Sequence, residues 1–158
     1  MFGKDNMSHA QQVYRTLCNT LDRLDWKYNK EKEDLLVHFG VNGDKMPIKF
    51  IITVDEERKL IRLASPLPFK MSEQKRVEGA IAACAASYGM ADGSFDYDVS
   101  EGEIVFRSTA SFSGSDIGEG LFRYMLHCAY TMVNKYNIRF LSLDKGIIDF
   151  TKFLSDKD

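Results

Sequence analysis

Alternating apolar residues around an Asn-Gly pair constrain the fold of this chain most strongly. Leu35, Val37 and Phe39 recur at every second position before Asn42-Gly43. An Asn-Gly pair between alternating segments is the strongest short-range signal for a β-hairpin with a two-residue turn. The sequence therefore predicts an antiparallel hairpin in which Val41 faces Asp44 and one apolar face forms from three pairs: Phe39 with Met46, Val37 with Ile48, and Leu35 with Phe50.

A polar turn at residues 55–58 predicts a third strand beside this hairpin. With that turn the apolar face continues through two further pairs, Ile52 with Ile61 and Phe50 with Leu63. Pro66-Leu67-Pro68 follows, and proline cannot donate a hydrogen bond to a neighbouring strand. We therefore expect a meander of three strands that ends at these prolines.

Helical spacing of apolar residues predicts two helices around this meander. The first spans residues 8–25, with a short strand after it at Trp26-Lys27-Tyr28. The second begins at Ser72 as N-cap and reaches Tyr88. The expected buried stripe of the first helix is Val13, Leu17, Leu21 and Leu24, and that of the second is Val77, Ala80, Ile81, Cys84, Ala85 and Tyr88.

A second hairpin and a third helix follow after Gly93. Taking Glu101-Gly102 as the loop places Asp96 opposite Arg107 as an exposed charge pair, whereas a three-residue loop would set Asp96 against Phe106. Asp116 and Glu119 resemble a capping box at the start of the third helix. Its expected apolar stripe is Ile117, Leu121, Tyr124, Met125, Cys128, Met132 and Tyr136, and Ile147, Phe150, Phe153 and Leu154 suit a short final helix.

The composition is that of a globular protein, and we expect one domain over residues 1–158. Of the 158 residues, 44% are apolar and 28% charged, which is sufficient for a single core. We expect residues 1–8 to be disordered and residues 144–158 to hold the short helix, packed either on its own chain or on a second copy. The three cysteines, Cys18, Cys84 and Cys128, are widely spaced, so we expect reduced, half-buried thiols.

Charge and hydropathy argue against nucleic acid and membrane as partners. The formal charge is −2, from 21 basic and 23 acidic residues, and no long basic run is present. No apolar run approaches the roughly 20 residues that a membrane-spanning helix needs, and the first six residues lack the apolar core of a signal peptide. We expect a cytoplasmic protein.

Three short motifs invite a chemical interpretation, and each has a simpler structural one. Ser72-Glu73-Gln74-Lys75 matches the SxxK pattern of serine acyl-enzymes but lacks their SDN and KTG elements. Asp96, Asp98 and Ser100 resemble the start of a calcium loop, but Glu101 stands where glycine is needed and Arg107 where glutamate is needed. The glycines near residue 118 fit no phosphate-binding motif. We expect no catalytic residue, cofactor or metal; His9, His38 and His127 are also scattered.

The outer face of the predicted sheet is the best candidate for a contact surface. If helices cover only the inner face, apolar and basic side chains would mix on the other. A simpler alternative is that these are scattered surface residues with no role. The candidate partner-contact residues are Leu36, Lys49, Ile51, Leu60, Arg62, Val105 and Arg107.

The predicted order of helix, three strands, helix, two strands and helix resembles the YbjN-like family of bacterial proteins and the type III secretion chaperone-like fold. The resemblance is carried by residues 93–98, residues 102–107 and the helix from Tyr124 to Tyr136, with residues 50–54 and 60–63 similar to the family's middle strands. It implies a two-layer α+β fold with an antiparallel sheet and helices on one face. The family carries a regulatory label, sensory transduction regulator, and no established active site. The related chaperones dimerise and hold extended peptide segments.

Two functions from different classes follow. We expect a non-enzymatic interaction module, a homodimer that binds a protein or peptide through the outer sheet face or an edge strand. The alternative is a small-ligand sensor or small hydrolase with a pocket between helices and sheet. The aromatic residues that could line such a pocket are Tyr88, Tyr97, Phe106, Tyr124 and Tyr130.

Overall fold

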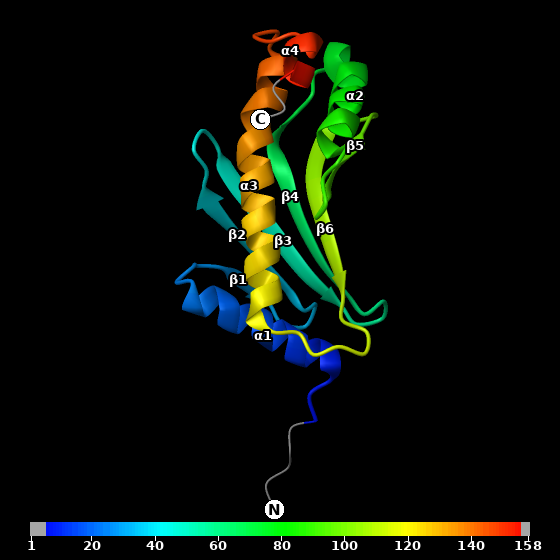
Figure 1. The fold of residues 1–158 in the computed structure, drawn as a ribbon. Helices are drawn as coiled ribbons and strands as arrows, with labels where there is room; N and C mark the ends of the chain where they lie inside the picture. The colour runs from blue at the N-terminus through cyan, green and yellow to red at the C-terminus, as the bar shows by residue number, and fades with distance from the viewer. Residues whose placement is uncertain (1–5, 156–158) are drawn as a thin grey trace, which may run out of the picture.

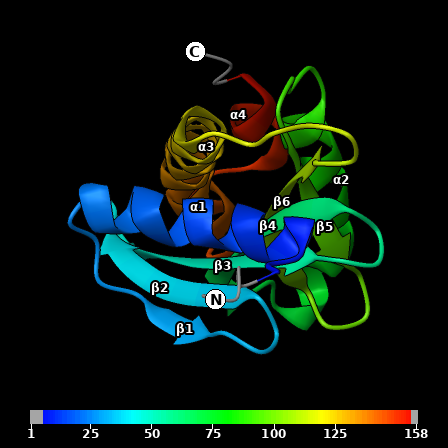
Figure 2. The same cartoon turned by 90° about the horizontal axis from the view of Figure 1, so that it is seen from below.

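A six-stranded antiparallel sheet with helices on one face forms the structure (Figures 1 and 2). The computed structural model describes residues 6–155. The strand order is β1-β2-β3-β4-β6-β5, and the predicted two-layer α+β fold is confirmed. The elements are α1 (His9–Arg23), β1 (Asn29–Glu31), β2 (Leu36–Asn42), β3 (Pro47–Asp55), β4 (Leu60–Lys70), the 3₁₀ helix η1 (Glu73–Lys75), α2 (Arg76–Ser87), β5 (Ser94–Asp98), β6 (Glu103–Ser111), α3 (Glu119–Asp144) and α4 (Phe150–Ser155).

The first hairpin has a longer loop than its Asn-Gly pair predicts. Phe39 pairs with Phe50 rather than with Met46, so the loop spans residues 43–46 and the predicted register is wrong by four positions. The loop is held by the Asn134 side chain of α3, which accepts from the Asp44 N–H (2.8 Å) and donates to the Asp44 carboxylate (2.7 Å). A tertiary contact therefore competes with the preference of the Asn-Gly pair for a two-residue turn.

The other two predicted registers are each wrong by two positions. Ile52 pairs with Leu63, and Phe95 pairs with Phe106. The loops contain left-handed residues, Lys59 (φ 55°) and Gly102 (φ 73°), which lengthen both turns. Because every shift is even, each side chain keeps its predicted face of the sheet.

β4 continues through the prolines at which the meander was expected to end. Its pairing with β3 stops at Ala64, and its ladder with β6 is irregular between Pro66 and Lys70. Proline is tolerated at such irregular or one-sided positions because no ladder hydrogen bond is lost.

The segment after α1 was wrongly predicted as a strand at residues 26–28. Asp25 adopts a left-handed conformation (φ 56°), and β1 begins only at Asn29. The Trp26 ring packs on Phe39, with 5.6 Å between ring centroids. The Tyr28 hydroxyl donates to Asp22 (2.8 Å), so these side chains close the end of α1 instead.

The helices differ in how well their apolar patterns identified the buried face. In α1, Val13, Leu17 and Leu21 are buried as expected, and Ser8 forms a capping box with Gln11. In α3 the buried face is rotated, because only Met125 of the predicted stripe is fully buried. The expected cap at Asp116 is also wrong: Gly118 is the N-cap, and Glu119 pairs with Arg23 of α1 (3.0 Å).

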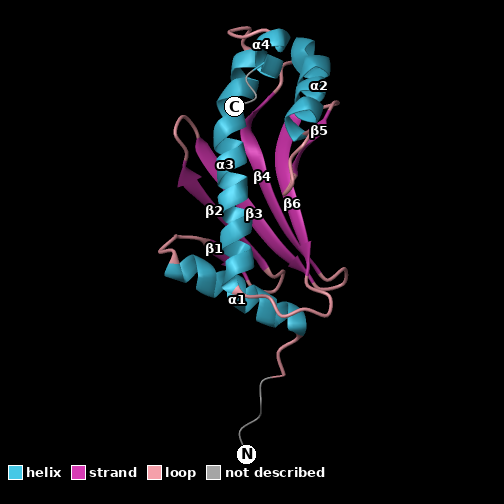
Figure 3. Ribbon diagram, in the orientation of Figure 1, coloured by secondary structure: helices cyan, strands magenta, loops and turns pink. Residues whose placement is uncertain are grey.

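The long helix α3 crosses the inner face of the sheet, as Figure 3 shows. It continues past Asn137, where its pattern weakens, and ends at Asp144. α4 returns onto it: Phe153 is buried, with its ring centroid 5.2 Å from that of Phe140. α4 therefore packs on its own chain.

Residues 1–5 and 156–158, which fall within predicted terminal segments, lie outside the described residues. None of the described helices is both long and apolar enough to span a membrane.

Candidate interaction surfaces

The outer sheet face, meaning the side of the sheet turned away from α1, α3 and α4, contains all seven predicted contact residues. Strand register aligns them in adjacent rows: Leu36 beside Thr53 and Arg62, and Ile51 beside Ala64 and Arg107. Lys49 and Arg107 are exposed. The remaining five are half-buried: Leu36, Ile51, Leu60, Arg62 and Val105.

Charges on the outer sheet face are mostly paired within the sheet. Arg62 bonds to Asp55 (2.8 Å), and Arg107 bonds to Asp96 (2.9 Å). The second pair forms as predicted, although across a diagonal instead of directly opposite. Lys49 forms no ion pair with any residue between 6 and 155, so it carries an uncompensated charge on this face.

A hollow of about 640 Å³ opens in the outer sheet face where β3 and β4 separate. All three prolines of the chain line it, together with the unpaired Lys49. The other lining residues are Asn29, His38, Phe39, Gly40, Ile48, Leu67, Phe69, Lys70 and Glu103. We name this feature the proline hollow.

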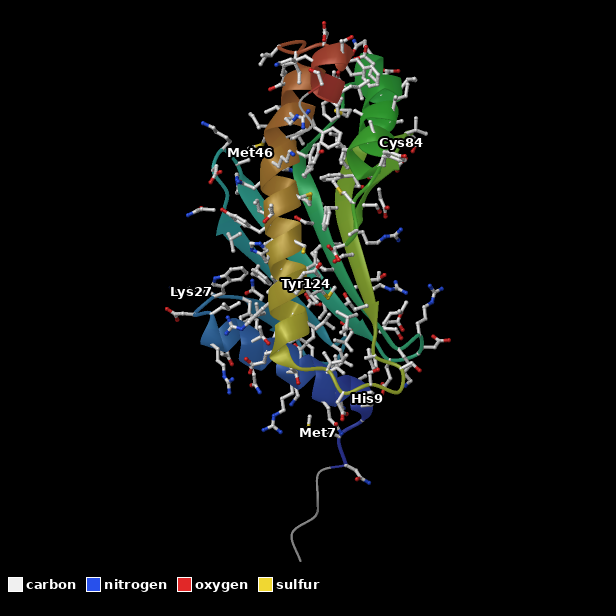
Figure 4. The ribbon with its side chains drawn as sticks, in the orientation of Figure 1. Met7, His9, Lys27, Met46, Cys84 and Tyr124 are labelled. Atoms are coloured by element: carbon white, nitrogen blue, oxygen red, sulfur yellow. The ribbon has the colours of Figure 1, made fainter. Side chains whose placement is uncertain are left out.

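A second uncovered surface lies on α2, and here the predicted stripe is inverted. Val77, Ile81 and Tyr88 are 69%, 51% and 85% exposed, and Cys84 is exposed on the side of the helix away from α3 (Figure 4). These four residues form what we call the α2 outer face. The buried residues are instead the small ones: Gly79, Ala82, Ala83 and Ala86.

Close packing of α2 explains the inversion. A Cβ atom added at Gly79 would lie 2.6 Å from the Tyr97 hydroxyl and 2.8 Å from the Met71 side chain, so only glycine fits. Burial beneath the helix raises the pKa of Tyr97. The small residues recur at i, i+3, i+4 and i+7, the spacing of one helix face. That spacing was present in the sequence and could have identified the buried side.

The start of α2 is built differently from the predicted Ser72 cap. The Ser72 hydroxyl donates to Asp144 of α3 (2.7 Å), and η1 precedes α2. Lys75 pairs with Glu78 (2.9 Å) and not with Ser72, so the SxxK segment is a structural junction. Arg76 donates to the carbonyl of Ser100, which ties α2 to the β5–β6 loop, where Val99 is 58% exposed.

The remaining motifs also form local structure. Asp98 accepts from the Ser100 N–H (2.9 Å) and hydroxyl (2.6 Å), and these bonds lower the pKa of Asp98. Across residues 6–155, no three His, Cys, Asp or Glu side chains are grouped so as to hold a metal. Cys18 is buried, which raises its pKa, and Cys128 is half-buried. The buried Cys18 and the exposed Cys84 both contradict the expectation of three half-buried thiols, which holds for Cys128 alone.

The five aromatic residues proposed to line one pocket do not all gather at one site. Tyr88 is exposed, Phe106 is fully buried, and Tyr130 donates to the Asn42 carbonyl (3.3 Å). Two open grooves of about 610 and 400 Å³ flank α3 and share Ala91, Asp92 and Gly93; Tyr124 lines the first, while Tyr88 and Phe106 line the second. A hydrogen bond to Asp92 raises the pKa of Tyr124 to about 12.

Comparison with known proteins identifies the fold. No family model and no curated protein matches the chain. Several solved structures do match, among them the following three. The HopA1–SchA chaperone–effector complex contains a chain that is 10% identical (TM-score 0.55; 83% of this chain and 98% of that chain covered). The ExsC–ExsE complex gives 12% identity (TM-score 0.56; 83% and 95% covered).

YbjN from E. coli, a proposed transcription regulator, is the third, at 12% identity with a TM-score of 0.56 and coverage of 80% of this chain and 92% of that one. Such low identities establish shared architecture and leave function open. The predicted resemblance is therefore confirmed at the level of fold: this chain has the type III secretion chaperone-like fold, which it shares with YbjN.

Proposed function

We propose that this chain is a non-enzymatic protein-interaction module that acts as a homodimer and binds an extended segment of a partner protein on the outer sheet face. The observation that carries the proposal is the position of the predicted contact residues, which share one helix-free side of a six-stranded sheet. Apolar side chains beside fixed charges are typical of protein contact surfaces.

The comparisons support a protein partner. Two of the similar structures are complexes, one of a chaperone with its effector and the other of ExsC with ExsE. The alternative of a small-ligand sensor or small hydrolase is less favoured, because the aromatic residues expected to line its pocket are dispersed, with Tyr88 exposed and Phe106 buried.

The α2 outer face is the proposed dimer interface. It exposes Val77, Ile81 and Tyr88 on one helix face, and a two-fold axis would bring this face against its own copy. Burying these side chains against a partner is favourable because it removes apolar area from water. α2 also lies beside β5, the edge strand of the sheet, so a second copy there would shield that edge from other strands.

Affinity capture of partners from host lysate, followed by purification of one captured partner, tests the sheet. Leu36→Asp and Ile51→Asp introduce unpaired charges into the outer sheet face and are expected to lower partner affinity at least tenfold. Ile147→Asp is the matched control, because Ile147 is 75% exposed in the α3–α4 connection. Light scattering after size-exclusion chromatography measures the oligomeric state. A strict monomer whose Leu36→Asp and Ile51→Asp variants bind like wild type would refute the proposal.

A further inference from the structure

We propose that the proline hollow is the subsite that selects the partner: it accepts an extended peptide segment in which an acidic residue stands next to an aromatic one. This inference rests on the proposed function and makes it more specific. It names one location on the outer sheet face and one chemistry for the occupant.

The prolines themselves keep β3 and β4 apart. In a strand, successive backbone N–H and C=O groups point alternately to the two neighbouring strands. The Val54 N–H donates to the Leu35 carbonyl on the β2 side (3.0 Å), so odd-numbered residues of β3, including Pro47, direct their backbone groups to β4. Ile51 pairs with Ala64, so even-numbered residues of β4, including Pro66, point toward β3.

Pro47 and Pro66 therefore occupy positions where an N–H would face the opposite strand, and proline has none. Pairing between β3 and β4 accordingly ends at Ile51 and Ala64. The Ser65 hydroxyl donates to the Lys49 carbonyl (2.6 Å) and closes that end of the separation. The missing N–H groups of Pro47 and Pro66, together with the Ser65 bond, thus account for the end of strand pairing beside the hollow.

The walls of the hollow suit an aromatic side chain. Proline rings are rigid and apolar, and Pro47, Pro66 and Pro68 contribute three of them, with the half-buried Phe69 nearby. An aromatic side chain buries a large area with little loss of conformational entropy, which makes it an effective anchor in such a site.

The charges of the hollow favour an acidic neighbour for that anchor. Lys70 and Glu103 are cross-strand partners, and Lys70 also approaches Glu101 (3.5 Å), so its charge is balanced. His38 lies 3.6 Å from Glu31. Of the three basic residues that line the hollow, Lys49 alone has no acidic partner among residues 6–155. A carboxylate on the occupant would supply that partner.

An extended occupant fits better than a helical one. β3 from Pro47 to Phe50 is paired only on its β2 side, and the hollow extends across it, from residues of β1 and β2 on that side to residues of β4 on the unpaired side. Few backbone groups remain free there, because Pro47 lacks an N–H and the Lys49 carbonyl is already bonded. Side chains, rather than added strand hydrogen bonds, therefore determine the selectivity.

Fluorescence polarisation with three labelled peptides tests the inference. The probes are Gly-Ser-Thr-Asp-Phe-Thr-Ser-Gly, the same peptide with Lys in place of Asp, and the same peptide with Ala in place of Phe. Wild type is expected to bind the first peptide about fivefold more tightly than the second, the range of a partly exposed ion pair, and more tightly than the third. Lys49→Glu should reverse the preference between the first two.

Lys32→Glu is the charge-matched control, since Lys32 is exposed in the turn after β1 and does not line the hollow. Pro66→Thr supplies the missing N–H and is expected to weaken binding of the first peptide; amide chemical shifts of the unbound protein report whether that variant is folded. The inference is overturned if the first peptide fails to bind at millimolar concentration, or if Lys49→Glu and Lys32→Glu bind alike.

The test separates two failures. If Ile51→Asp abolishes peptide binding and Lys49→Glu leaves it unchanged, the proposal that the outer sheet face binds peptide is retained. The proposal that the proline hollow is its selective subsite is then wrong. If both variants bind the peptide like wild type, peptide binding by the outer sheet face fails as well.

Discussion

The outer sheet face and the α2 outer face are both uncovered, yet they differ in chemistry. On the sheet, the apolar residues are half-buried and alternate with charges that are paired in place, as Arg62 is with Asp55. On α2, Ile81 and Tyr88 stand 51% and 85% exposed, with no such charges between them. The same chain therefore presents one surface with ordered charges and one that is mainly apolar.

This difference separates two kinds of association. A surface whose charges are paired within the protein can remain exposed to water when no partner protein is bound. The same charges provide selectivity when a partner protein binds. Large exposed apolar side chains provide affinity and little selectivity, which suits permanent contact with an identical copy. The proposal assigns the partner to the first surface and the second copy to the other, so variants in one should leave the other intact.

Ile81→Asp is expected to have the largest effect. A charge at the centre of the α2 outer face would be buried without a partner in the dimer, at a cost of roughly 3 kcal/mol, or more than a hundredfold in dimer dissociation constant. Light scattering over a dilution series measures this. Affinity for the captured partner per chain should change less than threefold. An equal loss of dimerisation and of partner affinity would mean that the two surfaces do not act separately.

Gly79→Leu comes next, because it tests why α2 turns its large residues outward. The new side chain would overlap Tyr97 and Met71, and overpacking of this kind costs about 2 kcal/mol in the free energy of unfolding. Urea denaturation gives the value. Gly120→Leu is the control, since no atom other than those of its chain neighbours and its own helix backbone lies within 4 Å of the Cβ position there. Equal stability of the two variants would contradict the close packing of α2.

Salt should distinguish the two surfaces to a smaller degree. Charges on the outer sheet face are exposed, so raising ionic strength from 0.05 M to 0.5 M is expected to weaken partner binding about fivefold. Dimerisation through apolar side chains should weaken less than twofold. Isothermal titration calorimetry measures partner binding and analytical ultracentrifugation measures dimerisation, each at both salt concentrations. If salt weakens dimerisation more than partner binding, the outer sheet face would be the dimer interface and the α2 outer face the partner site.

Arg107→Met is expected to have the smallest effect on folding. Its ion pair with Asp96 is 2.9 Å long, but both side chains are largely exposed, so the free energy of unfolding should fall by no more than about 0.5 kcal/mol. Thermal unfolding at low salt measures this. A loss above about 1.5 kcal/mol would mean that the outer sheet face contributes to stability and is not mainly a contact surface.

The sheet was largely predictable because strand patterning is local. Every register was misplaced, by four positions at Phe39 and by two at Ile52 and Phe95, and yet no side chain changed face. Alternation has a period of two, so an even error in loop length preserves the division between inner and outer residues. That is why all seven candidate contact residues lie on the outer side.

The loop lengths and the orientation of α2 on the sheet depend on contacts between residues that are far apart in the sequence. Asn134 lies 90 residues after Asp44 and holds the first hairpin loop. α2 carries small residues on one side and large ones on the other, and hydrophobicity alone favoured the large side as buried. The small residues also have helical spacing, and the closeness of Tyr97 and Met71 to Gly79 explains why their side is the one that fits.

By itself, the sequence determined the fold class, the order of the main elements and the two faces of the sheet, because these follow from short-range periodicity. The tertiary structure decided which of the two candidate sides of α2 is buried, how far β4 extends, and where its pairing with β3 ends. Those features require segments far apart in the chain to meet, and the space available between them, not their local pattern, sets the outcome.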